Sequence, residues 1–132
     1  MAFSQLKKMI KYELEYPIKS SLSILFDRLS TLSGLSEWFA DDVNLSRDGL
    51  YIFTWEGSEQ SAKLLSKKKN QHIRFQWEGS SDEFFEFRIQ IDELTSDISL
   101  IITDFADDDD DKEDSTQLWN LQIDQLKSVI GS

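Results

Sequence analysis

Cysteine is absent from this 132-residue sequence, which has one histidine, one proline and five glycines. Without cysteine, disulfides and thiolate chemistry are excluded. The sequence has no run of about 18 apolar residues, as a membrane-spanning helix requires, and its first eight residues lack the apolar core of a signal peptide. We therefore expect a cytoplasmic protein without membrane insertion, forming one domain over residues 1–132.

Positive charge is scarce as well, and the formal net charge is -11. Nucleic acids and anionic membrane surfaces bind basic proteins, so we expect neither as a partner. The negative charge is concentrated between Asp107 and Asp114, where seven carboxylates and one lysine stand together.

This acidic run is interpreted as a solvated loop just ahead of the last helix, whose N-terminus its carboxylates would stabilise. Weak calcium binding is the alternative, because calcium prefers six to eight oxygen ligands. Asp107–Asp111 lacks the alternating spacing and the glycine of a calcium loop. We therefore predict no metal site.

Apolar periodicity divides the chain into strands and helices. Tyr12, Leu14 and Tyr16 alternate with glutamates, which predicts a half-buried strand that Pro17 ends. A helix follows from Ser20 or Ser21, the cap residue, to about residue 32. Gly34 is expected to break this helix, and residues 35–39 could form a second helical turn. The apolar positions of the first helix have helical spacing: Leu22, Leu25, Phe26 and Leu29.

Six short strands are then predicted, at about residues 42–46, 50–56, 59–66, 71–78, 83–92 and 97–105. The chain ends in a helix from about Ser115 to Ile130, and its apolar stripe is Trp119, Ile123, Leu126 and Ile130. Because consecutive strands are joined by short turns, the sheet should be an antiparallel meander. The predicted class is α+β: a curved sheet of about six or seven strands around a long C-terminal helix, with one or two short helices after the first strand.

A five-residue phrase occurs nearly twice, as FTWEG at residues 53–57 and FQWEG at residues 75–79. Strand alternation explains the likeness better than internal duplication, because both copies place large apolar residues at every second position. Three of the predicted strands contribute large apolar side chains to one face of the sheet. These residues are Tyr51, Phe53 and Trp55, then Ile73, Phe75 and Trp77, then Phe85, Phe87, Ile89 and Ile91.

These segments resemble a known family. The stretches LSEWFAD (35–41), GLYIFTWEG (49–57) and HIRFQW (72–77) are similar to the START-like helix-grip superfamily, in particular to its branch that resembles the activator of heat-shock protein 90 ATPase. ISLIITDF (98–105) resembles the last strand of that branch, and residues 119–130 resemble its closing helix. The resemblance covers about residues 8–130.

The resemblance implies a cavity between the sheet and the last helix, which in many relatives holds an apolar ligand. The residues at these positions that would line it are Trp38, Tyr51, Phe53, Trp55, Phe75, Trp77, Phe85, Phe87 and Trp119. Aromatic rings suit a small hydrophobic, lipid-like ligand. The same rings could instead fill the core, and the domain would then act as a co-chaperone-like module on a protein partner. A homodimer through an exposed sheet edge or through Leu121 is a further alternative.

Enzymatic chemistry has little support in the sequence. The one histidine, His72, shares the outer face of its strand with Arg74 and Gln76. No nucleophile and base stand at a recognisable spacing. We therefore predict no catalytic residue and no cofactor.

Overall fold

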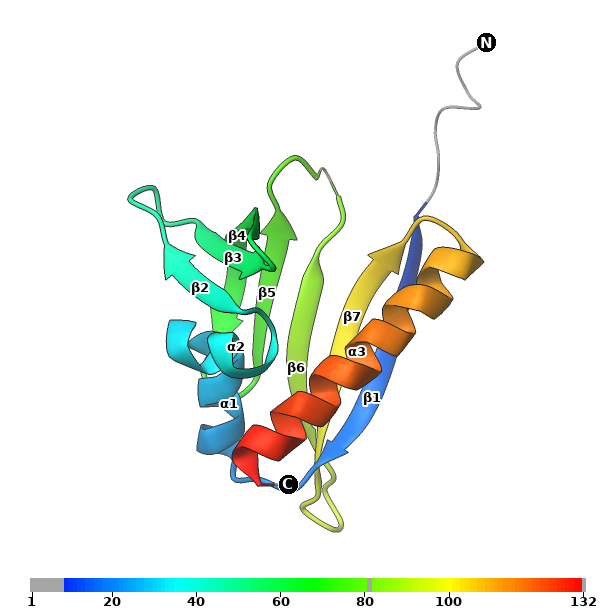
Figure 1. Ribbon diagram of the computed structural model, residues 1–132. Coiled ribbons are helices and arrows are strands. Elements are labelled where there is room, and N and C mark those ends of the chain that lie inside the picture. The colour runs from blue at the N-terminus through cyan, green and yellow to red at the C-terminus, as the bar shows by residue number, and fades with distance from the viewer. Residues whose placement is uncertain (1–8, 81, 132) are drawn as a thin grey trace.

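The computed structural model describes residues 9–80 and 82–131. Within them, seven strands form an antiparallel sheet that curves around a long C-terminal helix (Figure 1), in the order β1-β7-β6-β5-β4-β3-β2. This arrangement confirms the predicted α+β helix-grip fold. The strands are β1 (Ile10–Ile18), β2 (Asp42–Leu45), β3 (Tyr51–Trp55), β4 (Ser58–Lys68), β5 (His72–Trp77), β6 (Phe85–Ile91) and β7 (Ile98–Ala106). The helices are α1 (Leu22–Ser30), α2 (Leu32–Trp38) and α3 (Asp109–Ile130).

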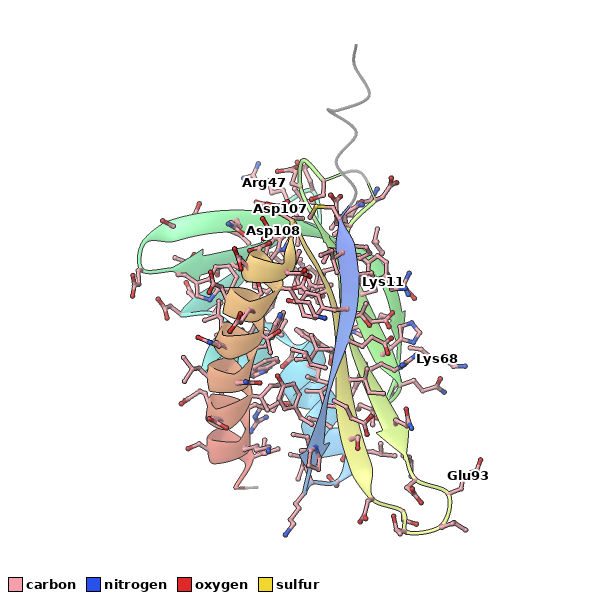
Figure 2. The ribbon with its side chains drawn as sticks, turned by 90° about the vertical axis from the view of Figure 1, so that its right-hand side faces the viewer. Lys11, Arg47, Lys68, Glu93, Asp107 and Asp108 are labelled. Atoms are coloured by element: carbon pink, nitrogen blue, oxygen red, sulfur yellow. The ribbon has the colours of Figure 1, made fainter. Side chains whose placement is uncertain are left out.

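Strands β2 to β7 form the predicted meander, because each pairs with the next along the chain. The β3–β4 hairpin turns on Glu56 and Gly57, whose φ values are 48° and 83°. Two consecutive positive φ angles characterise the two-residue turn whose twist matches that of the strands. The hairpin bends toward the side of the sheet where α3 lies (Figure 2).

Strand β1 joins the sheet at the far edge, beside β7, and Pro17 does not end it. Ile18 continues the pairing opposite Ile98 and is buried. Proline lacks a backbone donor and is tolerated on an edge strand, where one side of the strand has no partner to bond. The predicted strand was therefore one residue too short, because Pro17 lies on an edge strand, where a proline need not end the pairing.

Helices α1 and α2 meet at Thr31 rather than at Gly34. Thr31 has an extended backbone, and its hydroxyl accepts a hydrogen bond from the Gly34 amide at 2.9 Å. Gly34 lies inside α2, where a Cβ would stand 2.4 Å from the Asp27 carbonyl oxygen. The glycine is thus a close-packing residue between two helices, and its prediction as a helix breaker was wrong.

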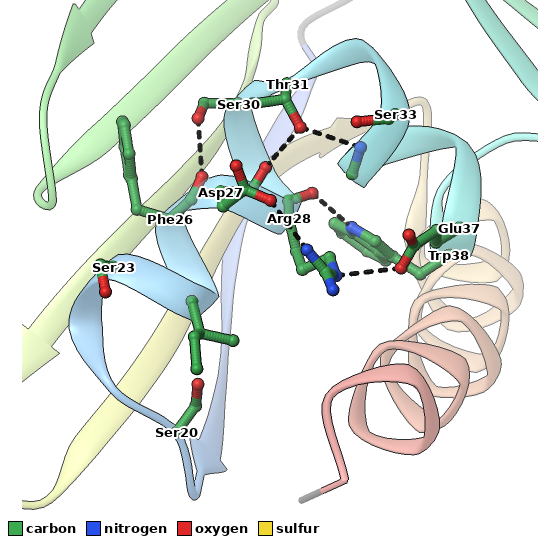
Figure 3. A network of polar contacts seen from close by, with 12 residues as sticks. Ser20, Ser23, Phe26, Asp27, Arg28, Ser30, Thr31, Ser33, Glu37 and Trp38 are labelled. Carbon is green, nitrogen blue, oxygen red and sulfur yellow. Dashed lines mark hydrogen bonds and ion pairs between the residues drawn. The ribbon is translucent and has the colours of Figure 1, made fainter.

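A network of polar contacts fixes the two helices to each other (Figure 3). The Trp38 indole donates to the Arg28 carbonyl at 2.8 Å, and the Arg28 guanidinium lies 2.9 Å from the Glu37 carboxylate. These contacts set the direction in which α2 ends, and therefore the position of Phe39, the residue that follows.

Helix α3 begins at Asp109, six residues earlier than predicted, so most of the acidic run is helical. The Asp108 side chain accepts from the Asp111 amide at 2.8 Å, and the Asp111 side chain accepts from the Asp107 amide at 2.8 Å. Carboxylates satisfy the free amides and the positive end of the helix. Figure 2 shows Asp107 and Asp108 at this end of α3.

Candidate functional site

A pocket opens between helix α3 and one end of the concave face of the sheet, the end with the β3–β4 turn. Its volume is about 480 Å³. Five of its twelve lining residues are aromatic, and three carry carboxylates. The lining residues are Phe39, Asp41, Trp55, Glu56, Gln60, Trp77, Phe85, Asp104, Ser115, Leu118, Trp119 and Gln122.

Strand β4 carries no large apolar side chain beside this space. Strand β4 lies between β3 and β5, and its residues opposite Trp55, Phe53 and Tyr51 are only Ser58, Gln60 and Ala62. Neighbouring strands are separated by about 4.8 Å, so β3 and β5 are about twice that distance apart. The rings of Trp55 and Trp77 nevertheless have centroids 6.0 Å apart. The two indoles therefore lean toward each other across the small or polar residues of β4.

Phe39 separates the pocket from the filled core. Its ring is almost completely buried, stacks on Trp119 at 5.7 Å and meets Phe53 edge-on at 5.2 Å. The Phe39 carbonyl accepts hydrogen bonds from the Trp55 indole at 2.7 Å and from the Gln122 amide at 2.9 Å. One residue at the end of α2 therefore holds pocket-lining side chains from both the sheet and α3.

Asp104 brings a carboxylate to the pocket from strand β7. Its Oδ2 accepts from the Trp119 indole at 2.9 Å and from the Tyr12 hydroxyl at 3.4 Å, while Oδ1 accepts from the Phe105 amide at 2.8 Å. Burial raises the pKa of Asp104, and the hydrogen bond from Trp119 opposes this shift. Burial and the nearby Asp104 carboxylate raise the pKa of Tyr12 to about 12.

The nine predicted lining residues separate into two groups. Trp55, Trp77, Phe85 and Trp119 line the pocket. The other five pack into the core or against it and do not line this pocket; they are Trp38, Tyr51, Phe53, Phe75 and Phe87. Ligand binding by any of them remains a prediction.

Eight of the twelve residues that line the pocket were absent from the predicted lining, and Asp104 and Phe39 are two of them. Asp104 has the same strand parity as Leu100 and Ile102, which are buried, so alternation along β7 could have placed it on the inner face. Phe39 had no comparable signal. It follows a short helix, and its orientation depends on the packing of α2 against α1.

Elsewhere, His72 lies among polar neighbours, with its Nε2 2.7 Å from the Ser66 hydroxyl. Residues 9–80 and 82–131 contain no group of three or more histidine, aspartate or glutamate side chains placed to hold a metal ion. No helix in the described part of the chain is long and apolar enough to cross a membrane.

Comparison with known proteins agrees with the fold described above. The model of the START-like superfamily domain matches residues 6–132. BfR322 from Bacteroides fragilis is 35% identical over 92% of this chain and 91% of its own, with a TM-score of 0.63. The Aha1 dimer from Colwellia psychrerythraea is 18% identical over 92% and 96%, with a TM-score of 0.73. CalU16 from Micromonospora echinospora is 16% identical over 89% and 71%, with a TM-score of 0.62. No curated protein sequence shows a significant match.

Proposed function

The chain belongs to the START-like superfamily, and from that premise we propose that it binds a small hydrophobic molecule in the pocket between α3 and the sheet, without catalysing a reaction. The observation that supports this proposal most directly is the pocket wall: five aromatic rings around a volume of about 480 Å³. Ligand sites are typically concave, mainly apolar, and furnished with a few polar groups that orient the ligand.

The polar groups of this pocket fit an orienting role. Asp104 is fixed by its bonds to Trp119 and to the backbone of Phe105, so its carboxylate has a defined direction. Gln122 is held by the Phe39 carbonyl. Groups that are already hydrogen-bonded within the protein lose little conformational freedom when a ligand binds.

Binding of Nile red, a neutral dye whose emission rises in apolar surroundings, tests the proposal. We expect saturable binding of about one dye per chain with quenching of tryptophan fluorescence, since three indoles line the pocket. Ser115 lines the pocket from α3, so Ser115→Trp should fill it and weaken binding. Ser128→Trp makes the same exchange on an exposed position of the same helix and should leave binding unchanged.

Two outcomes would overturn the proposal: no saturable binding by wild-type protein, or equal binding by Ser115→Trp and wild type. Circular dichroism of each variant must first show an intact fold, because an added ring can cost about 1–3 kcal/mol where space is short.

Association with a second copy of the chain is a second candidate function. Leu118 and Leu121 lie three residues apart on α3 and are 57% and 67% exposed. Residues at this spacing share one helix face. Among proteins of the same fold, the Aha1 of Colwellia psychrerythraea is described as a dimer. Analytical ultracentrifugation should detect a dimer that Leu121→Lys dissociates; a wild-type monomer at high concentration would overturn this candidate.

A further inference from the structure

The charges around the pocket all have one sign. Three of its twelve lining residues are carboxylic acids, Asp41, Glu56 and Asp104, and none of the described lining residues is lysine, arginine or histidine. The Asp41 carboxylate accepts from the Glu56 amide at 2.7 Å, which ties these two residues together beside the β3–β4 turn. Clefts lined by charges of one sign concentrate the opposite charge within them.

A lysine lies near Tyr12 but does not line the pocket. The Lys112 ammonium lies 5.7 Å from the centre of the Tyr12 ring, and Lys112 is not among the residues that line the pocket. The negative charge of Asp111 adds to the field at Asp104. The negative charge beside Asp104 therefore comes from β7, through Asp104 itself, and from the first turn of α3, through Asp111.

The aromatic wall favours the same kind of ligand. The electron-rich faces of tryptophan and phenylalanine attract cations, most strongly where water is excluded. Trp55, Trp77 and Trp119 contribute indoles to the pocket lining from two strands and from α3. Several aromatic rings that line one space together with carboxylates are a combination suited to quaternary ammonium groups.

Asp104 also retains capacity to accept a hydrogen bond. A carboxylate offers about four lone-pair positions. The described bonds from Trp119, Tyr12 and Phe105 use three of them. An ammonium group could occupy the fourth, whereas a ligand carboxylate would be repelled.

We propose that the preferred ligand of this pocket is an organic cation, in which a quaternary or protonated amine is joined to an apolar body. This inference rests on the proposed ligand-binding function and narrows its chemical class. Fatty acids and other anionic lipids are disfavoured, because Asp41, Glu56 and Asp104 present no positive partner for their head groups.

Two ligands of matched shape separate the effect of charge on affinity from the effect of shape. Benzyltrimethylammonium and neopentylbenzene have nearly the same shape, and only the first carries a positive charge. Titration followed by tryptophan fluorescence should show that the cation binds wild-type protein at least about tenfold more tightly. Ser115→Trp should weaken both ligands, which assigns the binding to the pocket.

Variants that each remove one carboxylate charge then show which carboxylates cause the preference for the cation. Asp104→Asn should lower the affinity for the cation by about tenfold and leave that for the neutral ligand nearly unchanged. Glu56→Gln, on the exposed turn, should act in the same direction more weakly. Glu93→Gln is the control, since it removes the same charge at the end of the sheet away from Asp107 and Asp108 (Figure 2), and it should change neither affinity.

The possible failures are distinguishable. If neopentylbenzene binds as tightly as the cation, or if Asp104→Asn and Glu56→Gln both leave the preference intact, the cation inference is wrong and the apolar pocket stands. If the cation binds and Ser115→Trp does not weaken it, binding lies elsewhere and the inference is again wrong. If neither ligand nor Nile red binds, the proposed function fails together with the inference.

Discussion

The concave face of the sheet has two halves with similar residues and different packing. In one half, Phe53, Phe75 and Phe87 are fully buried beneath α1, α2 and the ring of Phe39. In the other half, Trp55 and Trp77 continue the same alternation on the same strands and line an open pocket. An apolar face in the sequence therefore does not determine whether the space above it is filled; the elements that cover it do.

Two local features account for the difference. Strand β4 supplies only small or polar residues between Trp55 and Trp77, whereas helix α2 ends so that the Phe39 ring packs edge-on against Phe53 at the border of the filled half. Helix α3 packs on β1, β7 and α2, and its Trp119 contacts both Phe39 and Asp104.

Removing a ring from the filled half should have the largest effect. Phe53→Ala should lower the free energy of unfolding by roughly 3–5 kcal/mol, because it leaves a cavity among rings that cannot collapse onto each other. Urea denaturation measures this change. A loss below about 1 kcal/mol would mean that the filled half is as loosely packed as the pocket.

The contact between α1 and α2 should have the next largest effect, because it places Phe39 between the halves. Gly34→Ala forces a methyl group to within 2.4 Å of the Asp27 carbonyl oxygen. We expect a loss of about 1–3 kcal/mol in the free energy of unfolding. Ser33→Ala, in the same turn of α2, is the control and should change it by under about 0.5 kcal/mol. Equal stability of Gly34→Ala and wild type would show that the helices can separate freely.

The ionisation of Asp104 should have a smaller effect on the free energy of unfolding, and this effect should depend on pH. Burial raises its pKa in the folded protein above the ordinary 3.8. As pH rises from below 3.8, the unfolded chain ionises first and the folded state loses relative stability until Asp104 itself ionises. Asp104→Asn removes this loss, so the stability of the variant minus that of wild type should increase with pH through this window and then level off.

Denaturation of both proteins at a series of pH values gives this difference, in which the other carboxylates largely cancel. A difference that stays constant with pH, or decreases, would contradict the raised pKa and with it the buried position of Asp104 at the pocket.

The smallest effect is expected on the open side of β4. Gln60 lies opposite Phe53 on the neighbouring strand but is exposed at the pocket. Gln60→Ala should change the free energy of unfolding by no more than about 0.5 kcal/mol, as is usual for surface positions. A loss comparable to that of Phe53→Ala would remove the distinction between the two halves.

Periodicity predicted the sheet, the meander and the stripe of α3 because each depends on residues close in sequence. The position of Asp104 was within reach of the same alternation. The helical acidic run was not foreseen, because its carboxylates were placed in a loop ahead of the helix, whereas Asp108 and Asp111 accept hydrogen bonds from backbone amides of the run itself. Gly34 and Phe39 depend on how two helices approach each other, which a single sequence pattern does not encode.

The pairing of β1 with β7 has a consequence for how the protein forms during its synthesis. Ile18 and Ile10 of β1 pair with Ile98 and Ala106, which are 80 and 96 positions further along the chain. Ribosomes add about 5–20 residues per second, so the first strand emerges roughly 4–20 s before its partner exists. Since β7 is its neighbour in the sheet, β1 waits as an unpaired, half-apolar segment until β7 has been made. The meander from β2 to β6 can assemble meanwhile from local contacts, and the pairing of β1 follows only after residues 98–106 have been added.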